Sequence, residues 1–194
     1  YAKQSADSVY LGKCFFDLGL AFKNMGQNKK VKEYCAIAIE ILRKANAPVD
    51  QQVAVYITAA ETGVLLNELD EAKKNLDSAK KILHSFPDSR YFIDYYASEG
   101  MYLNVRGAYD ESLKSIEKGI LLAKSSNLRY NELRIWMKKF YLFFNKKDFS
   151  KAKEVLYYLI EQKEMTALSN NALQVYNGMA ETHAGLGDMK LAYE

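Results

Sequence analysis

The sequence predicts an all-α protein, an α-solenoid of about five antiparallel helix pairs. Between regularly spaced landmarks the apolar residues follow helical spacing, and no stretch alternates in the manner of a strand. A helix pair of this size cannot bury its apolar face alone, but stacking on a like neighbour buries that face for every pair. The landmarks are large aromatic residues that recur at intervals of 41, 40, 40 and 40, at Phe15, Tyr56, Tyr96, Trp136 and Tyr176.

The elements follow from this repeat and from the residues that interrupt it. Pro48 and Pro87 lie near junctions between pairs, where a helix should stop. The helices are expected at 5–26 with 28–45, 49–67 with 69–85, 89–107 with 109–126, 129–146 with 148–165, and 168–187 with 188 onward.

We expect one array of repeats over residues 1–194. Its repeats span about 8–47, 48–87, 88–127, 128–167 and an incomplete 168–194. Because the chain begins without Met and stops inside an expected helix, we also expect it to be a fragment of a longer protein.

One column of the repeat marks the ends of the first helices. It contains Gly26, Asn67, Gly107, Lys147 and Gly187. Glycine and asparagine tolerate the left-handed conformation that ends many helices. Acidic residues follow this column and are expected to cap free N–H groups or to oppose the helix dipole, at Glu68, Asp70, Asp110, Asp148 and Asp188.

A second column holds small residues where two helices cross closely. Gly19, Ala60, Gly100 and Ala180 lie four residues after the leading aromatic, and Phe140 breaks the rule. We therefore expect wider local spacing in the fourth pair.

These columns resemble the tetratricopeptide repeat family over essentially the whole chain. The clearest matches are Asn67-Glu68-Leu69-Asp70-Glu71-Ala72 and Gly107-Ala108-Tyr109-Asp110-Glu111-Ser112. The resemblance implies a right-handed superhelix whose first helices line a concave groove that binds peptides. The usual period is about 34 residues, and the longer period here is similar to that of repeats in bacterial signalling and regulatory proteins. Armadillo and HEAT repeats are the alternative, but their proline and third-helix patterns are missing.

Carried onto this sequence, the resemblance gives candidates for the groove. They are apolar in the middle and charged around it, so they either form a binding surface or pack against neighbouring first helices. They are Lys13, Phe16, Leu20, Ile57, Glu61, Asp94, Met101, Asn104, Arg134, Met137, Tyr141, Phe144, Asn177 and Glu181. A clamp for a C-terminal carboxylate is absent as a set, because Ala54 and Asp94 separate Lys13 from Arg134.

Composition and charge argue against several classes. A net charge of +3 with interspersed signs does not favour a nucleic-acid binder, and Glu61, Asp94 and Glu181 in the groove argue against an RNA-reading repeat. No apolar run is long enough to cross a membrane, so no membrane contact is expected from this segment. The compartment is undetermined.

No residue pattern indicates an enzyme, a cofactor or a metal site. His84 and His183 lie in different repeats, without a ligand set around them, and no phosphate-binding loop or nucleophile motif occurs. Cys35 aligns with Leu76, Ile116 and Leu156 and is expected to be a small buried hydrophobe. A disulfide between Cys14 and Cys35 remains geometrically conceivable across a helix pair.

The leading hypothesis is a non-catalytic scaffold that binds a protein or peptide. It would serve as the sensing or interaction region of a larger bacterial signalling protein, a sensor histidine kinase or a helix-turn-helix regulator. The alternative is a structural spacer or dimerisation scaffold without a peptide ligand. Self-association through the truncated C-terminal repeat is a further expectation.

Overall fold

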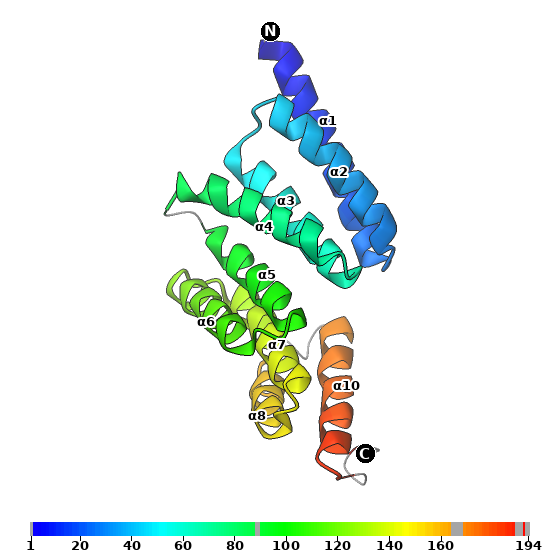
Figure 1. Ribbon diagram of the computed structural model, residues 1–194, viewed down its shortest axis with the longest axis vertical. Helices are drawn as coiled ribbons and strands as arrows, with labels where there is room; N and C mark the ends of the chain where they lie inside the picture. Colours follow the sequence, from blue (N-terminus) through cyan, green and yellow to red (C-terminus); the bar gives the residue numbers. More distant parts are fainter. Residues whose placement is uncertain (1, 88–89, 164–168, 189–191, 193–194) are drawn as a thin grey trace. The chain divides into compact units, whose positions relative to one another are not determined.

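The computed structural model describes residues 2–87, 90–163, 169–188 and 192, and all regular structure among them is helical (Figure 1). By their internal contacts the residues form two compact units, 1–98 and 99–194. The boundary falls inside the helix α5 (Phe92–Val105). We describe each unit by itself.

The unit 1–98 contains α1 (Ala2–Asn24), α2 (Asn28–Lys44), α3 (Val49–Leu65), α4 (Leu69–His84) and the start of α5. Along α2 the apolar residues recur every three or four positions, so they form one stripe that packs against α1 and α3. The stripe consists of Val31, Cys35, Ala38 and Leu42, which are at most 1% exposed. Cys35 is thus the buried hydrophobe that its alignment predicted, and it is a free cysteine.

The unit 99–194 contains the rest of α5, α6 (Tyr109–Ser125), α7 (Arg129–Asn145), α8 (Phe149–Ile160) and α10 (Ser169–Gly185). Helix α7 packs against α6 and α8, and α8 packs against α10. The core between them includes Leu133, Phe140, Leu156, Leu159 and Val175, none more than 1% exposed.

The first four predicted helix pairs and the first helix of the fifth pair are confirmed. Two of these helices are shorter than predicted. Helix α5 begins at Phe92 rather than at residue 89. Helix α8 ends at Ile160 rather than at residue 165, because a turn follows in which the Gln162 N–H donates to Leu159 O at 3.1 Å. Most of the second helix expected from residue 188 onward lies outside the described residues.

The column of turn residues adopts the predicted left-handed conformation. Backbone φ is +71° at Gly26, +60° at Asn67, +75° at Gly107, +61° at Lys147 and +79° at Gly187. The left-handed conformation of Asn67 turns the chain so that the Glu68 N–H donates to Gly63 O at 2.7 Å. This hydrogen bond satisfies a free carbonyl at the end of α3. Asn46 and Asn127, after the second helices, have the same conformation and were not anticipated.

The acidic residues Asp70, Asp110 and Asp148 take the roles predicted at the helix starts, and Glu68 does not. Asp148 does accept a hydrogen bond from the Lys151 N–H at 3.3 Å. Glu68 precedes α4 without a side-chain cap, because its carboxylate pairs with Lys32 instead. Asp70 and Asp110 lie in the first turns of α4 and α6, where a negative charge opposes the helix dipole.

The large residue in the fourth pair is accommodated by the next first helix. Phe140 is 1% exposed, and a Cβ at Gly178 of α10 would lie 2.9 Å from the Cζ of its ring. The ring therefore occupies space that Gly178 leaves open. The wider spacing expected in this pair stays a prediction.

Candidate functional site

The predicted groove residues lie on the first helices, and we call this surface the first-helix face. Helices α1 and α3 and the start of α5 carry it in one unit, and the end of α5, α7 and α10 carry it in the other. Lys13, Arg134, Tyr141, Asn177 and Glu181 are exposed; Phe16, Leu20, Asp94, Met101 and Phe144 are half-buried; Ile57, Glu61, Asn104 and Met137 are buried.

In the unit 1–98, polar side chains of the first-helix face bind one another. Lys23 of α1 donates to Glu61 of α3 at 2.6 Å, and the Ser98 hydroxyl of α5 donates to the other Glu61 oxygen at 2.9 Å. Glu61 is 8% exposed, so this pairing offsets the cost of burying its charge. The sequence proposed Glu61 but gave no sign of Ser98, because the contact joins residues 37 positions apart.

The apolar candidates of this unit contribute to its packing. Phe16 packs against the cluster formed by Val31, Cys35 and their neighbours. Ile57 is 5% exposed. This part of the face is therefore largely occupied by its own side chains.

In the unit 99–194, the candidates also meet across neighbouring first helices. The Lys138 ammonium of α7 lies 3.3 Å from the Met101 sulfur of α5. Burial raises the pKa of the Tyr141 phenol, and the negative charge of Glu181 on α10 raises it further. Tyr141 still exposes 41% of its surface, so a large aromatic ring faces solvent between α7 and α10.

Asn104 has an unusual environment on the same unit. It is 6% exposed, and its Oδ1 is buried without a hydrogen-bond partner. Such an acceptor costs about 1–3 kcal/mol. Asn104 lies one turn beyond Met101 on α5, and Tyr141 lies one turn beyond Lys138 on α7. Helix α5 ends just before α6 begins at Tyr109, and the Tyr109 hydroxyl donates to Asn145 O at the end of α7 at 3.3 Å. Helices α5 and α7 therefore both end near the start of α6. Asn104 and Tyr141 are therefore at the same level of the face.

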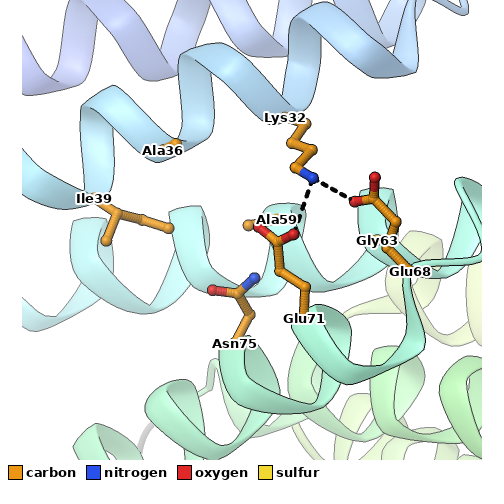
Figure 2. Close-up of a pocket in the computed structure, with 8 residues that line it drawn as sticks. All are labelled: Lys32, Ala36, Ile39, Ala59, Gly63, Glu68, Glu71 and Asn75. Carbon is orange, nitrogen blue, oxygen red and sulfur yellow. Dashed lines mark hydrogen bonds and ion pairs between the residues drawn. The ribbon is translucent and has the colours of Figure 1, made fainter.

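A small cavity lies between α2, α3 and α4, away from the first-helix face. Lys32 of α2 is one of its lining residues and reaches toward two carboxylates of the next pair (Figure 2), Glu68 at 2.6 Å and Glu71 at 2.9 Å. These hydrogen bonds, the one to Glu68 above all, raise the pKa of Lys32. The cavity holds about 50 Å³. That volume suits one or two water molecules and is far below the roughly 300 Å³ of a small-molecule site.

Groups that could bind metal do not gather among the described residues. No three His, Cys, Asp or Glu side chains there lie close enough together to hold an ion. His183 is 4% exposed, and its Nδ1 has no hydrogen-bond partner. None of the described helices is long and apolar enough to cross a membrane.

Comparisons with known proteins identify the fold. No protein-family model matches the sequence. An Arabidopsis thaliana protein, Protein KINESIN LIGHT CHAIN-RELATED 2, is 25% identical over 185 residues, which cover 89% of this chain and 27% of that protein. The chain thus spans about a quarter of the length of the curated relative it matches.

A solved structure is similar over nearly the whole chain. It is the crystal structure of a variant of nearly identical TPR-like repeats from a Podosopora anserina protein titled a putative kinesin light chain, with a TM-score of 0.67 and 14% identity. The match covers 96% of this chain and 91% of that one. The chain therefore has the tetratricopeptide-like repeat fold, which confirms the fold that the residue columns predicted.

Proposed function

We propose that this chain is a non-catalytic scaffold that binds a protein segment or peptide on its first-helix face, mainly in the unit 99–194. The observation that carries the proposal is the surface around Tyr141. Its exposed aromatic ring packs against Phe140, which also contacts half-buried Phe144. Lys138, one turn earlier on α7, contacts half-buried Met101 of α5, and Asn104 lies one turn beyond Met101. Tetratricopeptide-like folds generally bind proteins, which supports the same conclusion.

These side chains suit an extended segment. Exposed aromatic and methionine side chains offer adaptable apolar contact area. An extended backbone supplies N–H donors, and one such donor would offset the cost of the unpaired Asn104 oxygen once the amide turns toward it. In the unit 1–98 the comparable polar groups, Lys23, Glu61 and Ser98, are already paired with one another.

The test compares two tyrosines of similar exposure. A random peptide library displayed on phage supplies a binder, which is then labelled and titrated against variants. Tyr141→Ala on α7 should weaken binding at least tenfold, because aromatic contacts carry much of the affinity at such surfaces. Tyr157→Ala on α8, where the side chain is 44% exposed against 41% for Tyr141, is the matched control and should bind as the parent chain does. Equal losses in the two variants, or none in either, would reject this face as the site.

A third variant separates binding from folding. Asn104→Leu removes a buried acceptor that has no partner, so it should raise the melting temperature while it weakens binding of the same peptide. Lower stability together with unchanged affinity would mean that Asn104 is a structural residue.

The role in a larger protein is the finer part of the proposal. The repeat period of 40 or 41 residues supports a sensing or interaction region in a bacterial signalling protein. The names of both matched proteins support a second candidate, association with a kinesin. Co-purification with kinesin favours the latter, and a kinase or helix-turn-helix module next to these repeats in the parent gene favours the former.

A further inference from the structure

Glu181 of α10 is an exposed carboxylate beside the aromatic surface of α7. It stands 40 residues after Tyr141, in the same column of the repeat, so the two side chains lie at one level of neighbouring first helices. Burial raises the pKa of the Tyr141 phenol, and the nearby charge of Glu181 raises it further. Among the described residues, none forms a hydrogen bond or an ion pair with Glu181. Its charge is therefore available to a ligand.

Two phenyl rings of the fourth pair pack against α10, one before and one after Glu181 along that helix. A Cβ at Gly178 would lie 2.9 Å from the Cζ of Phe140, and a Cβ at Gly185 would lie 2.7 Å from the ring of Phe149. Glu181 lies three residues after the first of these glycines and four before the second. This part of α10 is therefore held close against the fourth pair.

Phe144 of α7 belongs to the same aromatic surface. Its ring is half-buried and contacts both of those rings, with its centroid 5.7 Å from that of Phe140 and 5.5 Å from that of Phe149. Tyr141 stands one turn earlier on α7, and the centroid of its ring lies 4.9 Å from that of Phe140. The fourth pair thus offers Glu181 aromatic rings and no cation.

The unit 1–98 shows which group complements a carboxylate in this column. Glu61 of α3 occupies the column of Glu181, and Lys23 of the preceding first helix donates to it at 2.6 Å. Counted by the period of the repeat, the residue that corresponds to Lys23 on α7 is Phe144. A phenyl ring has no N–H group to donate to a carboxylate. The cation that Glu61 receives from its own chain is therefore missing beside Glu181.

We propose that Glu181, Tyr141 and Phe144 form a seat for one basic side chain, an arginine or a lysine, of the segment bound on the first-helix face. The seat rests on the proposed function, because its ligand belongs to that segment. The carboxylate accepts hydrogen bonds from a guanidinium or ammonium group. The aromatic rings attract the same cation and cover its apolar stem.

The cations of α7 on this face lie at other levels. Lys138 stands one turn before Tyr141, and its ammonium contacts the Met101 sulfur of α5. Arg134 stands a further turn before Lys138. The charge that acts on the Tyr141 phenol is that of Glu181. The seat therefore favours a cation at the level of Tyr141.

Peptide selection tests the seat. A random peptide library displayed on phage is selected against the parent chain and, in parallel, against Glu181→Gln, which removes the charge and keeps the size of the side chain. Peptides selected by the parent chain should share an arginine or a lysine at one position, and peptides selected by Glu181→Gln should lack that preference. Glu154→Gln, at an exposed glutamate of α8, is the matched control and should select the same peptides as the parent.

A double-mutant cycle measures the contact. Replacing the shared basic residue of a selected peptide by norleucine should weaken binding to the parent chain about fivefold, because exposed ion pairs and cation–π contacts are each weak. The same replacement should matter less to Glu181→Gln, which retains only the rings. Against Glu181→Lys, a peptide with glutamate at that position should bind more tightly than the peptide with the basic residue.

The seat can fail while the proposed function stands. Peptides that lose affinity for Tyr141→Ala but show no preference for a basic residue would overturn the seat alone. Equal effects of the norleucine replacement on the parent chain and on Glu181→Gln would do the same. A library without binders, or binders that Tyr141→Ala does not weaken, would reject the proposed function and the seat together.

Discussion

The two cysteines lie on the two helices of one pair, Cys14 on α1 and Cys35 on α2, and their thiols differ in burial. Cys35 is fully buried, and Cys14 is half-buried. Burial raises the pKa of the Cys35 thiol to about 12, against a small lowering by the charge of Lys23. Because only the thiolate attacks alkylating reagents, the reactivity of Cys35 in the folded chain is suppressed by its pKa and by its lack of access.

We predict that iodoacetamide at pH 8 modifies Cys14 and spares Cys35. With a pKa of about 12, roughly one Cys35 thiol in ten thousand is ionised at that pH. Mass spectrometry of digested chains measures the two sites, and urea should make them equally reactive. Comparable labelling of both cysteines in the folded chain would contradict the burial of Cys35.

Gly100 shows how much of a residue's surroundings can be predicted from its column in the repeat. The column held Gly19, Ala60 and Gly100, so the sequence indicated a small residue at the helix crossing without distinguishing alanine from glycine. In the structure a Cβ at Gly100 would lie 2.5 Å from Ile116 Cγ1. The Ser112 hydroxyl donates to Gly100 O at 2.7 Å. The need for glycine depends on side chains of α6 that the column does not contain.

At the scale of the helix, the ends were the most predictable feature. The turn column is local chemistry, since one residue must adopt positive φ to end the helix. Lys147 is the exception in composition, because it holds φ +61° without being glycine or asparagine. A side chain in that conformation costs on the order of 1 kcal/mol.

We therefore predict that Lys147→Gly stabilises the chain by about 0.5 kcal/mol, the strain relieved less the added freedom of glycine in the unfolded state. Urea denaturation should show a higher midpoint. Lys124→Gly, the same exchange inside the last turn of α6, should lower the midpoint, because glycine costs up to about 1 kcal/mol in a helix. If Lys147→Gly lowers the midpoint as Lys124→Gly does, the left-handed residue is not strained.

Contacts between helices were less predictable, for a physical reason. Glu68 was expected to cap α4, and its carboxylate instead reaches Lys32 of α2. Local sequence contains the helix N-terminus but not the cation that competes for the carboxylate. The same applies to the site, where Glu61 and Tyr141 were proposed from their positions but Ser98 and Lys138 enter only through contacts between neighbouring first helices.

For the whole molecule, the two compact units predict that a core substitution destabilises mainly the unit that contains it. In repeat proteins each repeat contacts its neighbours, so stability is distributed along the chain. Leu42→Ala, at a side chain 1% exposed in α2, should cost about 2–5 kcal/mol. Hydrogen exchange should then accelerate in α1 and α2 while α7 and α8 keep their protection.

The mirror experiment is Leu159→Ala in α8, where the side chain is fully buried. Exchange should accelerate in α7 and α8 and stay slow in α1 and α2. A uniform loss of protection after either substitution would mean that both units unfold as one cooperative block.

The contact between Phe140 and Gly178 limits the freedom to rearrange this protein. At the position of Gly178 the earlier repeats carry Asp17, Thr58, Ser98 and Lys138. Moving the fourth repeat in front of any of these would press a phenyl ring against a Cβ, whereas moving the fourth and fifth repeats together keeps the ring and its space. The repeats have similar residues in their columns, but the contact between Phe140 and Gly178 requires the fifth repeat to follow the fourth. Engineered or naturally duplicated arrays would have to preserve this order.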